Sequence, residues 1–466
     1  MTGRHPGEAG RRKSARRPWP ALAAARERPR PGRDRRPGET AARERPRPAA
    51  DRPEAVARYP PWMQPFDPEA PLPGAPEPWA GSEMPSPRSG PPYHATDMIL
   101  SEPALAARIL ERLAPRDGPA ARLAGAIRSA SAGGHPVVVV GCGTSEHGAV
   151  AVAEILREAN RAAGLPAELG AGGAPVAVQA FEGSLEPALG GPGAVVIGVS
   201  HEGGTWATNR ALSAARDAGA TTALLTAAAG SPGAGVADIV ISTDELDQSW
   251  CHTVGYLSPI VIAAAVGAHL TGVAIRPAAA RALLAGGLAP GAVSETVAVV
   301  RALAEVDRLI VLGSGADRIA ARELVLKIEE GTHLPAATRD LETMLHGHLA
   351  GTDERTGLVL LLAEPAARGP RTARALGVLR ACREIGIRAA LIAPAVVAAE
   401  VDRGLTPAGR IIVPEAPDLP GTVAALLATA VSLQLLTERL AILRGVNPDP
   451  IRRDDPRYLA AAAAAG

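Results

Sequence analysis

The segment Val137-Val-Val-Val-Gly-Cys-Gly-Thr-Ser145 indicates the fold class of this chain. Four β-branched apolar residues in a row are typical of a strand that is buried on both faces of a parallel sheet. A glycine-rich turn follows them, and the long apolar-periodic segment from Gly148 to Ala163 then predicts a helix. The order of strand, turn and helix predicts the first unit of a doubly wound α/β sheet.

The same pattern returns 172 residues later as Leu309-Ile-Val-Leu-Gly-Ser-Gly-Ala-Asp317. Further strands are expected at Val195–Val199, Ala223–Thr226, Leu358–Ala363 and Ala389–Ile392, and further helices at Asp97–Leu113, Trp206–Ala218 and residues 421–444. A pattern that recurs at this spacing indicates two copies of one domain. We therefore predict an α/β protein with two tandem doubly wound parallel-sheet domains, residues 129–275 and 276–444, preceded by entry helices at 95–128 and followed by a tail at 445–466.

Residues 1–94 form a separate compositional region. They hold 21 of the 44 prolines, and residues 1–58 carry 17 Lys and Arg against 7 Asp and Glu. Such a segment buries too little apolar surface to offset its chain entropy, so we predict that 1–94 is a disordered Pro/Arg-rich segment. Two other interpretations remain: a basic interaction arm, and a translation start at Met63, Met84 or Met98.

The overall composition is that of a globular protein, with 47% apolar and 21% charged residues. The net charge is +1, and because the N-terminal region is basic, the rest of the chain is acidic overall. A nucleic-acid partner is therefore not expected. The most apolar stretches, Pro259–Ile275 and Thr422–Leu436, are interrupted by polar residues and indicate buried helices rather than membrane spans.

Cys142, Cys251 and Cys382 lie far apart, and none belongs to a CxxC pair. Neither a disulfide framework nor a zinc site is expected, which fits a reducing cytoplasm. No pair of histidines with a carboxylate has a metal-ligand spacing, so no metal and no cofactor are predicted.

Two turns between a strand and a helix carry polar groups, Gly141–Ser145 and Ser200-His-Glu-Gly-Gly-Thr205. The first is not a dinucleotide fingerprint, because Glu146 stands where the third glycine would be. Turns of this kind expose backbone N–H groups and hydroxyls at the carboxyl end of a parallel sheet, where they suit a sugar or a sugar phosphate. The candidate binding residues are Cys142, Gly143, Thr144, Ser145, Ser200, His201, Glu202 and Thr205.

Glu323, Lys327 and Glu330 have the i, i+4, i+7 spacing of one helix face. A solvated stripe of charges is the plain interpretation of this pattern. However, the chain has two lysines, Lys13 and Lys327, against 47 arginines. An amine can lower its pKa and exchange protons, whereas a guanidinium stays charged, so a lysine at this place hints at amine chemistry.

At these residues the chain resembles the sugar isomerase (SIS) family in its double-domain form, particularly the isomerase half of the glucosamine-6-phosphate synthases. The resemblance covers about residues 97–450. It rests on Cys142–Ser145, on Ser200–Thr205, and on the family's Glu-x₃-Lys-x₂-Glu helix with a His-Gly pair sixteen residues later, which is His346-Gly347 here.

The resemblance implies roles for four residues. Glu330 would be the base that moves a proton between C1 and C2 of the sugar, and Lys327 and Glu323 would polarise and orient the O1/O2 edge. His346 would open the sugar ring, and in the family this histidine crosses from a partner subunit, which implies a homodimer.

Several positions depart from the family pattern. Glu202 replaces a serine of the phosphate site, His201 replaces a glutamine, and Thr343 stands where the family has a glutamate, with Glu342 adjacent. The 445–466 tail has no lysine to take part in ring opening, although Arg452, Arg453 and Arg457 are near enough in sequence to reach over the site. Residues 1–94 do not match a glutaminase domain, so glutamine-driven synthesis is not expected.

Three hypotheses follow. The first is a sugar-phosphate aldose–ketose isomerase, or an amino-sugar-phosphate deaminase, that works through an enediol-type proton transfer. The second is a non-catalytic sugar-phosphate sensor with the same fold, and the third is a carbon–nitrogen lyase on another anionic substrate. His147, His269 and His333 are interpreted as packing or surface residues, and Trp206 as either a sugar-stacking or a helix-packing residue.

Overall fold

The computed structural model describes residues 65–81, 85, 87–186 and 189–465. All of them belong to one compact unit that spans residues 54–466. This unit contains two five-stranded sheets with the orders β2-β1-β3-β4-β5 and β10-β9-β8-β6-β7, and all neighbouring strands are parallel. Read from β7 to β10, the second sheet has the order β7-β6-β8-β9-β10, which corresponds strand for strand to β2-β1-β3-β4-β5 of the first. The predicted α/β class with two doubly wound sheets is therefore confirmed.

The strands are β1 (Val137–Gly141), β2 (Pro175–Gln179), β3 (Val195–Val199), β4 (Thr221–Thr226), β5 (Ile239–Ser242), β6 (Arg308–Leu312), β7 (Ala336–Arg339), β8 (Thr356–Leu361), β9 (Arg388–Pro394) and β10 (Gly409–Val413). The helices are α1 (His94–Leu113), α2 (Pro119–Ala132), α3 (Thr144–Ala162), α4 (Ala180–Leu185), α5 (Trp206–Asp217), α6 (Val254–Thr271), α7 (Pro277–Gly287), α8 (Pro290–Leu303), α9 (Ala316–Thr332), α10 (Leu341–Leu345), α11 (Arg368–Ile385), α12 (Ala395–Glu400), α13 (Gly421–Leu443) and α14 (Pro456–Ala465). Short 3-10 turns lie at Ala234–Val236, His348–Gly351 and Arg403–Leu405.

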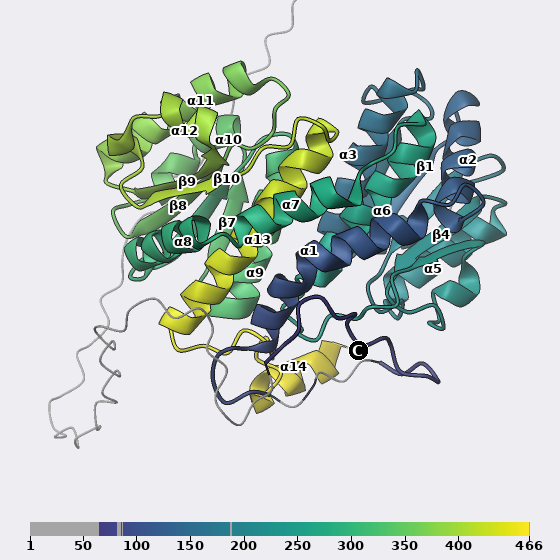
Figure 1. Ribbon diagram of the computed structural model, residues 1–466, viewed down its shortest axis with the longest axis horizontal. Helices are drawn as coiled ribbons and strands as arrows, with labels where there is room; N and C mark the ends of the chain where they lie inside the picture. The colour runs from purple at the N-terminus through teal and green to yellow at the C-terminus, as the bar shows by residue number, and fades with distance from the viewer. Residues whose placement is uncertain (1–64, 82–84, 86, 187–188, 466) are drawn as a thin grey trace, which may run out of the picture. The chain divides into compact units, whose positions relative to one another are not determined.

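The alternation of side chains along β1 explains the layers. Val137 and Val139 face one core, and Val138 and Val140 face another, so the strand is buried on both sides as its composition predicts. The first core is shared by both sheets and contains helices α1, α3, α6, α7, α9 and α13. Figure 1 shows α1, α7 and α13 running between the two sheets. A smaller core lies on the outer side of each sheet.

Helices α6 and α13 are long and apolar enough to cross a membrane, but 83% of each apolar window is buried inside the protein. Both belong to the core that the two sheets share. Their hydrophobicity therefore serves packing within the fold, in agreement with the interpretation of these stretches as buried helices.

The N-terminal region differs in part from the prediction of disorder through residue 94. Residues 1–64 lie outside the described residues, whereas residues 65–81, which we call the strap, are fixed on the first half of the fold. Leu72 is buried and its backbone N–H donates to Glu245 at 2.9 Å, while the Leu246 N–H donates to the carbonyl of Pro73 at 2.8 Å. These anchors come from the segment after β5, so composition alone gives no sign of them.

Candidate functional site

The predicted charged face of α9 is buried. The side chains of Glu323 and Lys327 are each 1% exposed, and that of Glu330 is 22% exposed. Lys327 Nζ lies 2.6 Å from Glu330 Oε2 and 3.6 Å from Glu323 Oε1, so one ammonium joins two carboxylates. The interpretation as a solvated stripe is therefore wrong for this face. An ammonium with this little contact with water persists because the two carboxylates compensate it.

Helix α3 supplies the other partners of this cluster. Lys327 Nζ donates to Thr144 Oγ1 at 2.9 Å, and His147 Nδ1 donates to Glu323 Oε2 at 2.6 Å. The interpretation of His147 as a packing or surface residue missed this contact. No pattern within α3 reveals it, because it depends on α3 lying against α9. The cluster is thus formed by a helix from each half of the chain.

The pKa values of the two glutamates are shifted in opposite directions. Burial raises the pKa of Glu323, but the attraction of Lys327 and the bond from His147 outweigh it and hold the pKa below the ordinary value. For Glu330 burial dominates over the pull of Lys327, and the pKa is raised. Burial opposes the charge on Lys327, yet Glu330 and Glu323 keep its pKa above the ordinary range. Glu323 is therefore the permanent counter-ion, and Glu330 is the carboxylate that is better able to take up a proton.

A cavity of about 420 Å³ opens beside Glu330. Its wall unites both predicted turns with Glu330 of the α9 cluster, whereas Glu323 and Lys327 do not line it. The predicted residues that line it are Cys142, Thr144, Ser145, His201, Glu202, Thr205 and Glu330. The topology explains this meeting, because β1 and β3 are adjacent parallel strands whose carboxyl ends share one edge of the sheet.

Gly143 and Ser200 shape the two turns without lining the cavity. Gly143 caps α3 with φ 57° and ψ −129°, a conformation that favours glycine. Ser200 is buried, and its hydroxyl donates to Thr205 Oγ1 at 3.2 Å. Both residues are therefore part of the frame of the site.

His201 is a neutral polar group of the cavity wall. Burial lowers its pKa to about 4, and its Nε2 accepts the backbone N–H of Asp247 at 2.8 Å. The neutral ring consequently carries its proton on Nδ1. Its neighbour His252, whose ring centroid is 5.3 Å away, also lines the cavity, and burial lowers its pKa well below the ordinary value.

Three further residues of the cavity wall belong neither to the two turns nor to α9. Trp79 of the strap, Trp250 and Arg453 of the tail all line it. The Arg453 guanidinium lies 4.3 Å from the ring centre of Trp250. Of the three tail arginines expected near the site, Arg452 instead lies over Tyr458, and Arg457 pairs with Asp455.

His346 stands apart from this cluster. Its side chain is 70% exposed, and its Nε2 lies 2.7 Å from Oε1 of Glu342, which Arg374 also binds. It is not among the residues that line the cavity. Within one chain, the structure therefore does not bring His346 together with Glu323, Lys327 and Glu330, the α9 residues of the same family motif.

The matching turn of the second sheet is closed. Asp317 accepts the backbone N–H groups of Ala363 and Glu364, and the Glu364 carboxylate accepts the N–H of Ala316 at 3.1 Å. At this turn the N–H of Ala316 and the side chains of Asp317 and Glu364 are thus already engaged within the protein. The two halves of the chain are not equivalent in chemistry.

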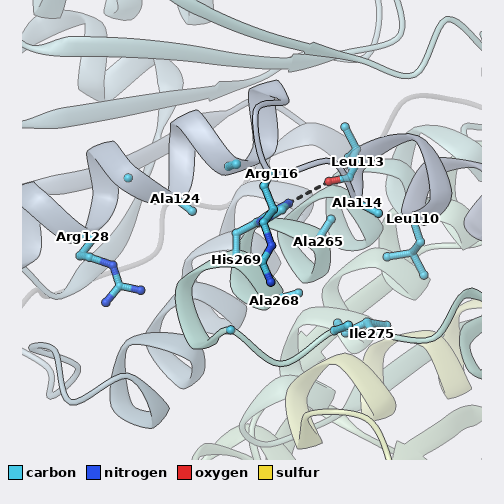
Figure 2. A pocket seen from close by; sticks show the side chains of 14 residues that line it. Leu110, Leu113, Ala114, Arg116, Ala124, Arg128, Ala265, Ala268, His269 and Ile275 are labelled. Atoms are coloured by element: carbon cyan, nitrogen blue, oxygen red, sulfur yellow. Dashed lines mark hydrogen bonds between the residues drawn. The ribbon is translucent and has the colours of Figure 1, made fainter.

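Within residues 65–81, 85, 87–186 and 189–465 there is no group of three His, Cys, Asp or Glu side chains placed to hold a metal ion. A larger cavity of about 470 Å³ lies between α1, α2 and α6 (Figure 2). Its wall is mostly alanine and leucine, and its His269 is engaged with the carbonyl of Leu113 at 2.9 Å. Among the described residues, its wall has no carboxylate, hydroxyl or thiol, so the chemistry points to the cavity beside Glu330.

No protein-family model matches the sequence, and no curated protein sequence matches it. Solved structures do resemble the fold. The C-terminal domain of a glucosamine-fructose-6-phosphate aminotransferase from Francisella tularensis has a TM-score of 0.64 at 16% identity, covering 78% of this chain and 99% of that one. Tagatose-6-phosphate ketose/aldose isomerase from Escherichia coli has a TM-score of 0.62 at 19% identity, with coverages of 78% and 97%.

Glucosamine-6-phosphate deaminase from Thermotoga maritima has a TM-score of 0.56 at 17% identity, covering 77% of this chain and 97% of that one. These structures are matched over almost their full length, so both sheets and the helices between them correspond. Identities this low establish a common fold and leave activity to be argued from the site. The chain has the fold of the double-domain SIS phosphosugar isomerases.

Proposed function

We propose that this protein is an aldose–ketose isomerase of a sugar or sugar phosphate, or an amino-sugar deaminase that begins with the same proton transfer. The observation that carries the proposal is the buried Glu323–Lys327–Glu330 cluster beside a cavity lined by two polar turns. Structural neighbours that are named as isomerases and a deaminase support it as analogies of fold.

The proton transfer follows from the geometry of Glu330. Its carboxylate lines the cavity, and its raised pKa makes it a stronger base than an exposed glutamate. It takes the proton from C2 of the open-chain aldose, and the electron pair of that bond forms a C1=C2 bond. The π electrons of the C1 carbonyl move to O1, which gains a proton to complete the enediol. The proton is then returned at C1 while O2 gives up its hydroxyl proton and becomes the carbonyl oxygen, so the ketose has the same atoms as the aldose. In an amino-sugar deaminase, the same transfer would leave a C2=N imine, and water adding at C2 would release ammonia and leave a carbonyl at C2.

Lys327 would stabilise the oxygen that gains negative charge in this step. Its ammonium is already held between Glu330 and Thr144, at 2.6 and 2.9 Å, so it needs little reorganisation. Glu323 and His147 are hydrogen-bonded to each other and hold Lys327 in place. They act through Lys327 and are positioning residues.

The experiment is proton NMR in D₂O with glucosamine, fructose and their 6-phosphates. Exchange of the C1 or C2 proton reports enolisation even where net conversion is small. Glu330→Gln should lower the exchange rate by about 10²- to 10⁴-fold, the usual contribution of a general base. The matched control is Glu329→Gln, which changes the adjacent exposed glutamate outside the cavity. Exchange that survives in Glu330→Gln would contradict the assignment of the base.

A non-catalytic sugar sensor is the alternative, and the carboxylate of Glu202 in a turn that otherwise carries hydroxyls favours it. The two functions separate cleanly, because a sensor would bind the sugar without proton exchange. Binding by calorimetry in the same samples gives that comparison.

We further propose a cytoplasmic homodimer in which His346 lies near the site of a partner subunit. The exposed side chain of His346 supports this arrangement, since its position leaves it available to another chain. The three free cysteines support a reducing compartment.

A further inference from the structure

We infer that Trp79 and Glu202 select an unphosphorylated sugar, either neutral or carrying an amino group, with Trp79 as a stacking platform and Glu202 as a barrier to phosphate. This inference deepens the proposed function and rests on the same cavity. It concerns the specificity of binding, so it can be tested separately from turnover.

The strap delivers Trp79 to the turn Ser200–Thr205. The indole Nε1 donates to the carbonyl of Glu202 at 3.0 Å. Its six-membered ring lies against Gly204, where an added Cβ would come within 2.8 Å of Trp79 Cζ2. Since a larger residue at 204 would displace the indole, the glycine and the tryptophan form one surface of the cavity.

Aromatic residues are concentrated at this cavity. The whole chain has 5 tryptophans, and two of the three in the described part, Trp79 and Trp250, line this one wall. Arg453 covers the ring of Trp250 at 4.3 Å, whereas Trp79 is half-buried. An indole that combines an apolar face with a hydrogen-bonded edge suits the C–H face of a sugar ring.

The charges on the wall disfavour a phosphate dianion. Among the described residues that line the cavity, Glu202 and Glu330 are acidic and Arg453 is basic, while His201 and His252 are kept neutral by burial. The Glu202 carboxylate has no hydrogen bond or ion pair within the described part of the chain, so no cation compensates it. It stands shortly before α5 begins, at the helix end where a phosphate would otherwise gain from backbone N–H groups.

A sugar hydroxyl or ammonium would satisfy that carboxylate. A hydroxyl can donate to it, and an ammonium would in addition pair with its charge. The same wall offers Thr205 and His201 as polar partners for the rest of the ring. The cavity is therefore complementary to a sugar without a phosphate at this end.

Calorimetry on the full chain compares glucosamine with glucosamine 6-phosphate and fructose with fructose 6-phosphate. The wild type should bind each free sugar at least tenfold more tightly than its phosphate. Glu202→Gln should shift that ratio at least tenfold towards the phosphate. Glu182→Gln, which removes an exposed charge from α4, should leave it unchanged. A wild type that prefers the phosphates, or that binds neither member of either pair, would overturn the inference.

Saturation-transfer NMR tests the platform. Irradiation of the indole protons should reach the C–H protons of a bound sugar in the wild type and in Trp206→Phe, since Trp206 is 60% exposed and does not line the cavity. Because Trp250 also lines the cavity, the comparison is made in a Trp250→Phe background. There the transfer should be lost in Trp79→Leu, with affinity for the free sugars reduced at least tenfold. Transfer that persists without Trp79 would refute its role. Because both measurements report binding alone, selective binding without proton exchange would reject the proposed enzyme and leave this inference standing.

Discussion

Lys327→Met offers the sharpest test of the buried cluster. Methionine has nearly the length of lysine, so the substitution removes the ammonium without opening a large cavity. It leaves Glu323, which is 1% exposed, without the cation 3.6 Å away, and takes the 2.6 Å partner from Glu330. Removing one member of a buried ion pair typically costs about 3–5 kcal/mol, because the remaining charge is desolvated and uncompensated. We expect the free energy of unfolding to fall by about that amount at neutral pH.

Urea unfolding followed by circular dichroism measures this loss, and a second substitution shows where it comes from. Glu323→Gln added to Lys327→Met removes the stranded charge, so the double variant should recover at least about half of the loss. The control is Arg276→Met, which breaks a surface pair with Asp418 and should cost no more than about 1 kcal/mol. A loss below about 1 kcal/mol for Lys327→Met, or a double variant no more stable than the single one, would refute our account of the cluster.

Three further predictions concern the histidines and a turn. The folded pKa of His201, about 4, lies below its unfolded value, so the stability that its burial contributes is present above about pH 6.5 and is lost as the pH falls. Relative to His201→Gln, the wild type should lose about 2 kcal/mol of unfolding free energy between about pH 7.5 and about pH 5, and an equal change in both proteins would contradict the shift. If His346 serves a partner subunit, then mixing inactive His346→Ala with inactive Glu330→Gln after subunit exchange should restore proton exchange, because some dimers regain one complete site; a mixture without activity would argue for a site within one chain. Gly143→Ala should lower the unfolding free energy by about 1–3 kcal/mol, because the φ of Gly143 is 57°. The control Gly125→Ala, inside α2 with open space around it, should raise the unfolding free energy by about 0.5–1 kcal/mol. Thermal unfolding measures both changes.

The central strands and the charged face of α9 follow from local patterns in the sequence. The buried runs at Val137 and Leu309 predicted β1 and β6, because a strand buried on both faces needs an unbroken apolar run. The i, i+4, i+7 spacing placed Glu323, Lys327 and Glu330 together, because helical geometry is set within a few residues. The shortage of lysine marked that face as unusual before its burial was known.

Strands β2, β5, β7 and β10 had no expected counterpart. They lie at the edges of the two sheets, β5 and β7 have four residues each, and all but β5 begin with a proline or a residue that is only partly buried. Such segments lack a continuous apolar run, so their conformation is decided by pairing with a neighbouring strand. That pairing exists only once the sheet has formed.

The set of residues that share the cavity with Glu330 depends on how distant segments of the chain pack together. His147 reaches Glu323 because α3 lies against α9, which is 176 residues away along the chain. Trp79 reaches Glu202 across 123 residues, through a strap held by Glu245 and Leu246. Arg453 comes from the other end of the fold. Periodicity is a local property and can be read within one element, whereas these contacts are fixed by the closure of long loops and the packing of distant helices, which no local pattern encodes.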